Sequence, residues 1–302
     1  MRAIFVGFAF CLGACERGIH TEGGDGAARS IEFPASEFPA TYPIGKQFAC
    51  LPDEAAMIAA HRAVSRGEGL AENSKTSLEA LINRGILVAE VDIAGLKDGT
   101  HILYHDGVWE QDSTGQGAVA ATTWEQAEKF LLRDTDGALT ADRPYRLADA
   151  LALARDRIYL EIDFKSSAGY ETVIDAVRAA DMADRVILIS HTDAQARRLA
   201  QLAPEMMLSV SVESMADVAA LEAEGVSRTR ISAWLWRGPY DDGFVAGLDA
   251  AGIPVLAWPD RDAVNETAGL ARLIVTDYAF EYAPIVGLNE AGLKTYRDCL
   301  KR

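Results

Sequence analysis

The chain has 302 residues, of which 49% are hydrophobic, and its 45 acidic residues outnumber 29 basic ones to give a formal net charge of −16. A charge this negative argues against nucleic acid and anionic membrane surfaces as electrostatic partners. An anionic substrate would therefore need a locally cationic site, supplied by arginine, lysine or a divalent metal.

The first residues have the pattern of a secretory signal. Met1 and Arg2 precede an apolar run of about ten residues, which is too short to span a bilayer because a helix needs about 20. The run ends in Leu-Gly-Ala-Cys at residues 12–15, which resembles the lipobox of bacterial lipoproteins, in which the cysteine is acylated. An ordinary signal with an incidental cysteine is the alternative.

We expect residues 1–14 to be a signal peptide and residues 15–48 to be a flexible tether, held at the membrane by acyl chains on Cys15. The tether segment is rich in Gly, Ala, Ser, Thr and Pro and has no sustained periodicity. Residues 49–302 suffice for one large domain. These features predict a lipid-anchored protein of the cell envelope, on the periplasmic side.

Short β-rich runs alternate with amphipathic stretches along this domain, which argues for βαβ units and a parallel sheet. Eight such strands, with a short extra one near His101, favour a single-domain α/β protein with the (β/α)8 TIM-barrel fold over an open doubly wound sheet. Neither a GxGxxG nor a Walker motif is present. Strands are expected at 58–62, 88–93, 101–105, 158–163, 186–190, 207–212, 231–233, 254–258 and 273–276. Helices are expected at 74–84, 147–156, 170–182, 193–202, 214–224 and 241–251.

The four cysteines divide into two pairs with different fates. Signal cleavage would remove Cys11 and acylation would use Cys15, which leaves Cys50 and Cys299 on the oxidising side of the membrane. In a barrel the segment that enters the first strand and the end of the last helix lie at the same face. We therefore predict a Cys50–Cys299 disulfide, with two free or buried thiols as the alternative.

Polar residues recur at the carboxyl ends of the predicted strands, where this fold builds its active sites. Glu90 and Asp92 are two residues apart on one strand, so both side chains point to the same face. Asp163 and Lys165 repeat this spacing on the next barrel strand. Three carboxylates from two adjacent strands suit Ca²⁺ or Mg²⁺. The alternative is a solvated rim where these carboxylates pair with nearby Arg or Lys. The other polar or aromatic residues at strand ends are His61, Arg62, His105, Asp106 and Trp258.

Taken together, these residues resemble the glycerophosphodiester phosphodiesterase family. The resemblance covers residues 55 to 285 and is densest before residue 120. It is carried by His61-Arg62, Glu72-Asn73-Ser74, Glu90-Val91-Asp92, Lys97-Asp98-Gly99, His105-Asp106, the Ser-Thr-Gly-Gln-Gly turn at 113–117, Asp163-Phe164-Lys165, Trp258, and Ile-Val-Thr-Asp-Tyr at 274–278.

The resemblance implies metal-dependent hydrolysis of glycerophosphodiesters to sn-glycerol 3-phosphate and an alcohol. Imidazoles titrate near neutrality and can exchange protons with the attacking and leaving oxygens. A metal and two cations stabilise charge on the phosphoryl oxygens. By the resemblance, Glu90, Asp92 and Asp163 hold the metal, His61 and His105 are the general acid–base pair, Arg62 and Lys165 bind phosphate, and Trp258 stacks on the substrate.

The sequence departs from the family pattern at two informative places. Ala63 stands where the family usually has Gly after His-Arg. The third barrel strand carries Asp163 where the family more often has Glu before x-Lys, and Glu161, one layer deeper, is the alternative ligand. His191 ends the next strand and is either a rim residue or a loop residue. Asn73 precedes a helix and could be its N-cap, a site residue or both, because a cap at the mouth of a barrel also points at the site.

Two other functions remain open from the sequence. A phospholipase D-like lyase would share the His, carboxylate and Lys arrangement but would release a cyclic phosphate. A binding lipoprotein would capture phosphodiesters without turnover. The presence of both His61 and His105 argues against the second, because binding alone does not need two proton carriers.

Overall fold

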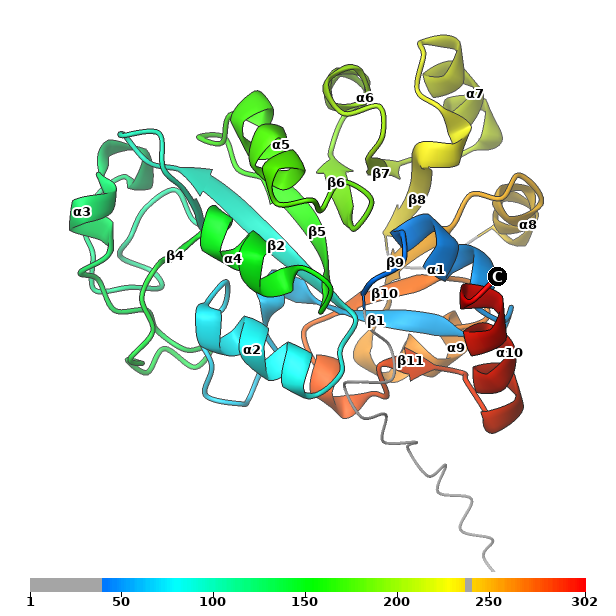
Figure 1. The fold of residues 1–302 in the computed structure, drawn as a ribbon, viewed down its shortest axis with the longest axis horizontal. Helices are drawn as coiled ribbons and strands as arrows, with labels where there is room; N and C mark the ends of the chain where they lie inside the picture. Colours follow the sequence, from blue (N-terminus) through cyan, green and yellow to red (C-terminus); the bar gives the residue numbers. More distant parts are fainter. Residues whose placement is uncertain (1–39, 237–240) are drawn as a thin grey trace, which may run out of the picture. The chain divides into compact units, whose positions relative to one another are not determined.

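A computed structural model describes residues 40–236 and 241–302, and eight parallel strands in it close into a barrel (Figure 1). Each barrel strand pairs with its two neighbours, and the circle closes because β1 pairs in parallel with both β10 and β2. The predicted TIM-barrel fold is confirmed. The barrel strands are β1 (Ala56–Ala60), β2 (Val88–Gly95), β5 (Tyr159–Phe164), β6 (Val186–Ser190), β7 (Met207–Ser211), β8 (Ile231–Trp236), β9 (Val255–Trp258) and β10 (Leu273–Thr276).

Helices connect successive barrel strands and cover the outside of the barrel (Figure 1). The longer ones bury an apolar stripe against the strands, as the periodicity of the sequence predicts. Side-chain caps fix where several begin; for example, the Ser74 hydroxyl accepts from the Ser77 N–H at the start of α2. The helices are α1 (Ile44–Cys50), α2 (Lys75–Asn83), α3 (Trp124–Ala127), α4 (Leu147–Ala154), α5 (Tyr170–Ala179), α6 (Asp193–Leu202), α7 (Met215–Ala223), α8 (Asp242–Ala250), α9 (Val264–Thr267) and α10 (Glu290–Leu300).

Two predicted strands differ from the observed ones in ways that affect the site. The first strand ends at Ala60, and residues 61–63 form a short 3-10 turn instead of its last residues. The extra strand near residue 101 is β3 (His101–Leu103), which pairs antiparallel with β2 and extends the sheet beyond the barrel. β4 (Tyr145–Arg146) adds to β3, and the residues between them pack around the buried Trp109. A further short strand, β11 (Ile285–Val286), pairs antiparallel with β1.

The predicted tether, residues 15–48, is wrong at its C-terminal end. Helix α1 begins within this segment. Its Ile44 and Phe48 side chains are buried in the core cluster at the amino ends of the barrel strands, here called the lower end of the barrel. Gln47, fully buried, donates from Nε2 to the Tyr159 hydroxyl at 2.6 Å and accepts from the Tyr296 hydroxyl. These contacts place residues 40–48 in the folded domain. The remainder of the predicted tether and the predicted signal peptide lie outside the described residues.

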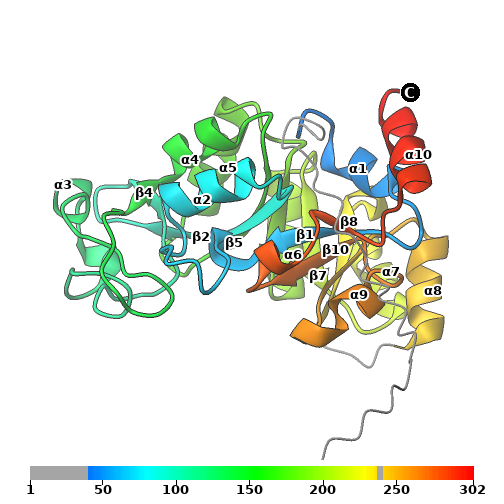
Figure 2. The same cartoon turned by 90° about the horizontal axis from the view of Figure 1, so that it is seen from below.

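Helix α1 is joined to the last helix of the chain. The predicted disulfide between Cys50 and Cys299 is present, with a Cα–Cα distance of 5.6 Å, and α1 and α10 lie side by side (Figures 1 and 2). A crosslink over 249 residues ties the two ends of the described domain. Such a crosslink removes conformational freedom mainly from the unfolded chain.

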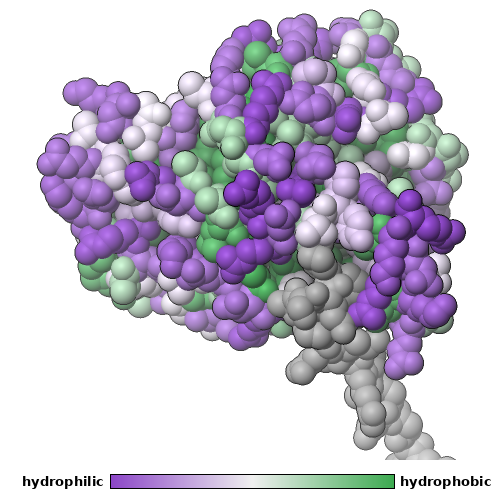
Figure 3. Space-filling view, in the orientation of Figure 1, coloured by the Kyte–Doolittle hydropathy of each residue, from purple (hydrophilic) through white to green (hydrophobic). Residues whose placement is uncertain are grey.

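The face of the domain in Figure 3 is mostly hydrophilic, in keeping with the excess of acidic residues. Large apolar side chains that are clearly exposed among the described residues are Val108, Leu139 and Leu270. None of the helices in the described ranges is long and apolar enough to cross a bilayer.

Candidate active site

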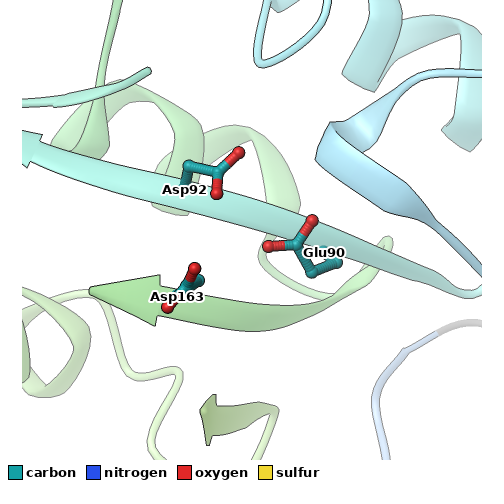
Figure 4. Close-up of side chains that lie close together, drawn as sticks. All are labelled: Glu90, Asp92 and Asp163. Carbon is teal, nitrogen blue, oxygen red and sulfur yellow. The ribbon is translucent and has the colours of Figure 1, made fainter. Parts of the chain in front are cut away.

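The pairing of β2 with β5 brings three carboxylates together. The register sets Asp92 opposite Asp163 and Glu90 opposite Glu161, with all four side chains buried. Oxygen atoms of Glu90, Asp92 and Asp163 all lie within 4.8 Å of one another (Figure 4). The spacing of two residues along each strand thus produces one acidic cluster on the inner face of the barrel.

This cluster fits a divalent cation. Two oxygens bound to one Ca²⁺ at about 2.4 Å can be at most about 5 Å apart, which the three side chains satisfy. Burial raises the pKa of Glu90 well above its usual value, and the nearby charges of Asp92 and Asp163 raise it further. A cation would relieve this repulsion.

Lys165 provides a positive charge within the cluster. Its Nζ lies 2.6 Å from Asp92 Oδ1 and 2.7 Å from Asp163 Oδ2. Burial would lower the pKa of Lys165, but the two carboxylates outweigh burial and raise it. Burial would likewise raise the pKa of Asp163, yet hydrogen bonds from His191 and Lys165 lower it to about 2. Lys165 and Asp163 are therefore both charged at neutral pH.

Asn73 holds Asp92 in place. Its Nδ2 donates to Asp92 Oδ2 at 2.7 Å, and its Oδ1 accepts from the Asp92 backbone N–H at 3.0 Å. Asn73 is buried and has a φ of +53°, a conformation that asparagine tolerates better than most residues. Asn73 is not the N-cap of α2, because Ser74 takes that position, and its side chain contacts the carboxylate cluster instead.

His61 lies at the mouth of the barrel, in the turn after β1. Its Nδ1 is 2.8 Å from Asp277 Oδ1, and its Nε2 is 3.9 Å from Glu90 Oε2. Burial would raise the pKa of Asp277, but the hydrogen bond and charge of His61, together with Arg66, lower it. An ionised carboxylate can only accept, so Nδ1 carries the proton. The ring packs edge-on against Trp258, with centroids 4.3 Å apart.

His105 has the same kind of partner at Nδ1. This nitrogen is 2.7 Å from Asp106 Oδ1, while Nε2 is 2.9 Å from Arg62 Nη2. Because a guanidinium only donates, Nε2 accepts and the proton of the neutral ring is on Nδ1. Both imidazoles are thus held by an aspartate at Nδ1 and present Nε2 to the site.

The turn after β1 aims Arg62 in two directions. Its backbone N–H donates to Glu90 Oε2 at 2.7 Å, and its guanidinium also contacts Glu72 at 3.1 and 3.2 Å. Arg62 and Ala63 have φ values of +51° and +53°. This left-handed backbone explains why a glycine would suit position 63, since a residue with a Cβ bears about 1–2 kcal/mol of strain there.

A cavity of about 220 Å³ opens beside the carboxylates. His61, Glu90, Asp163 and Trp258 line its reactive side. His191 also lines the cavity, and its Nε2 lies 2.8 Å from Asp163 Oδ1, so it is a residue of the active-site rim.

Through direct contacts, the structure brings together all eight residues that the sequence singles out: His61, Arg62, Glu90, Asp92, His105, Asp163, Lys165 and Trp258. Sequence reasoning placed Asp277 in the motif at residues 274–278 but missed its pairing with His61, because the two residues are far apart in the chain.

The segment that carries these residues matches a known protein family. Residues 61–280, more than half of the chain, match the model described as the glycerophosphoryl diester phosphodiesterase family. The chain belongs to this family. It is therefore a phosphodiester hydrolase, as the sequence predicts, and the matched segment holds every residue of the site described above.

Solved structures of glycerophosphoryl diester phosphodiesterases share the fold of this family member. A Parabacteroides distasonis enzyme is 23% identical with a TM-score of 0.70, over 80% of this chain and 91% of that one. An Agrobacterium tumefaciens enzyme is 19% identical with a TM-score of 0.63, over 76% and 99%. An Oleispira antarctica phosphodiesterase, solved with the product sn-glycerol-3-phosphate, is 19% identical with a TM-score of 0.62, over 83% and 99%. A comparison with curated proteins gives no match.

Glu161, the alternative metal ligand, lies outside the carboxylate cluster of this family member. It is fully buried, and neither carboxyl oxygen has a hydrogen-bond partner among the described residues. Burial raises the pKa of Glu161 to about 8; the nearby Ser209 hydroxyl acts in the opposite direction, and the charge of Asp163 adds to the rise. The residue is thus placed one layer below the cluster.

The raised pKa of Glu161 predicts a pH dependence of stability. Between about pH 4.5 and 8 the unfolded chain loses this proton and the folded chain keeps it, so the free energy of unfolding falls as pH rises. The loss approaches about 1.4 kcal/mol per pH unit inside the window. E161Q lacks this proton, so its stability relative to the wild type should rise by up to about 4 kcal/mol between about pH 5 and 8.5.

Urea unfolding of both proteins at the two pH values, in excess chelator, measures this difference. The surface substitution E54Q is the matched control, since Glu54 is exposed. Parallel stability curves for E161Q and the wild type would show that the Glu161 carboxyl keeps its ordinary pKa.

Proposed function

We propose that the chain hydrolyses glycerophosphodiesters to sn-glycerol 3-phosphate and an alcohol with the help of a divalent metal. The observation that carries this proposal is the buried carboxylate triad beside two imidazoles, each backed by an aspartate. The family match and the Oleispira antarctica phosphodiesterase solved with sn-glycerol-3-phosphate support it.

The charges of the site suit a phosphodiester although the chain as a whole is strongly acidic. Arg62 and Lys165 place two cations at the mouth, where they would bind the non-bridging phosphate oxygens. Glu90, Asp92 and Asp163 would hold Ca²⁺ or Mg²⁺, which both take oxygen ligands. When bound, the metal would stabilise the negative charge that builds up on the phosphoryl oxygens.

His61 and His105 are the proposed acid–base pair. Each ring carries its Nδ1 proton towards an aspartate, which leaves Nε2 to exchange a proton with the attacking or leaving oxygen. Asp277 and Asp106 would hold the rings in this tautomer and stabilise their protonated forms. Arg62 donates to His105 Nε2, so rotation of its guanidinium towards a phosphate would free that nitrogen.

Hydrolysis by the full chain should depend on a metal. We expect release of glycerol 3-phosphate from glycerophosphoethanolamine and glycerophosphocholine with Ca²⁺ or Mg²⁺, and loss of release in excess chelator. E90Q should weaken metal binding by at least about tenfold in calorimetric titration, because the negative charge of one carboxylate ligand is lost. D98N, a change on an exposed loop, should not. Release of a cyclic phosphate alone would favour the lyase, and binding without any product would favour the binding protein.

Removal of either proposed proton carrier should abolish most of the turnover. H61A and H105A should each lower kcat by about 10²–10⁴-fold, the usual contribution of general acid–base catalysis, with metal affinity retained. H101A is the matched control, because His101 hydrogen-bonds Gly169 and Thr172 outside the site. Rates near that of the wild type for either active-site variant would refute the assignment.

We further propose that Cys15 is acylated and anchors the enzyme in the cell envelope, on the periplasmic side. The basic start, the short apolar run and the residues before Cys15 support this. Mass spectrometry of the mature N-terminal peptide should show an acylated cysteine, and C15S should move the protein from the membrane to the soluble fraction. An unmodified N-terminal cysteine peptide in the wild type would contradict the anchor.

A further inference from the structure

The barrel interior contains a polar layer just below the active site. Glu161 on β5 and Ser209 on β7 line the cavity, and Ser232 on β8 pairs with Ser209 at the same level. Interiors of this fold are usually filled with branched apolar residues. The next layer down contains Tyr159 and Met207, which are larger and more apolar and belong to the core cluster that α1 covers. The polar layer is therefore confined to the floor of the cavity.

Glu161 differs from its polar neighbours in having no partner. The Ser232 hydroxyl donates to the Leu208 carbonyl at 2.8 Å, and the Ser190 hydroxyl donates to the Ser209 carbonyl at 2.9 Å. Both oxygens of Glu161 are buried without a hydrogen bond from any described residue. A buried polar group without a partner destabilises the fold. Packing therefore gives no reason for a carboxyl here, whereas a ligand with a hydrogen-bond donor would.

The cavity connects this floor to the site of the reaction. Its walls carry His61, Glu90 and Asp163 at the reactive level and Glu161 below them, with the apolar sides formed by Trp234 and Val275. Glu161 and Asp163 are two residues apart on β5, a rise of about 6.6 Å. A small alcohol esterified to a phosphate at the carboxylate triad has the length to reach Glu161.

We infer that the cavity floor is a subsite for the alcohol joined to glycerol phosphate, and that Glu161 selects alcohols with a hydroxyl or primary ammonium group at their far end. This inference rests on the proposed hydrolysis of glycerophosphodiesters. A carboxyl group accepts a hydrogen bond in either protonation state, so the subsite requires a donor. A quaternary ammonium group has no N–H or O–H and leaves Glu161 unpaired.

The full chain with its metal should therefore prefer two diesters over a third. We expect kcat/KM for glycerophosphoethanolamine and glycerophosphoglycerol to exceed that for glycerophosphocholine by at least about tenfold, chiefly through KM. E161L should bring this ratio towards one, and E161Q, which keeps an acceptor oxygen, should retain most of it.

S232A is the matched control, because Ser232 lies in the same layer and its hydroxyl is already bonded to Leu208. It should keep the ratio of the wild type. Calorimetric metal titration of E161L checks that the neighbouring triad is intact. The subsite is refuted if the wild type shows no preference, or if E161L lowers kcat/KM for all three diesters equally. Whether the wild type prefers the two donor-bearing diesters is measured without any variant. Failure of the proposed function looks different, since the wild type would then hydrolyse none of the three diesters.

Discussion

The in-register pairing of β2 with β5 is the constraint on which the rest of the site depends. It sets Glu90 and Asp92 beside Asp163 on one inner face, with Lys165 bonded to two of the three. A slip of one residue would turn one pair of carboxylates out of the barrel, because side chains alternate along a strand. The barrel fixes this register by closing on itself. A site built from two strands is therefore held in place by the pairing of all eight barrel strands.

Charge is organised locally against the trend of the whole chain. A protein with a net charge of −16 would repel a phosphodiester, yet Arg62 and Lys165 each lie at the mouth of the barrel beside a carboxylate cluster suited to a metal. The same acidic surplus is used to hold both imidazoles, through Asp277 and Asp106. Asp277 and Asp106 thus orient proton-carrying groups, and each has a partner within hydrogen-bond reach.

The two ends of the barrel are treated differently. The lower end is sealed by α1, whose Gln47 joins Tyr159 and Tyr296 and whose last residue is crosslinked to α10. The upper end keeps a cavity that descends past the triad to Glu161, the one cavity-lining carboxyl among the described residues that has no partner in the fold. Stability is thus concentrated at one end, while polar groups that folding does not satisfy face the end where a substrate enters.

The sequence by itself determined the barrel, because strands and helices alternate with clear periodicity, and it singled out eight candidate site residues, because they lie in short motifs that together resemble one family. It also predicted the Cys50–Cys299 disulfide. Only the tertiary structure excluded Glu161, the alternative that the sequence left open, from the triad, and only it showed that α1 begins within the predicted tether and that Asp277 holds His61. These are contacts between residues far apart in the chain, such as the 216 positions from His61 to Asp277, and no local pattern records which buried partner a side chain will meet.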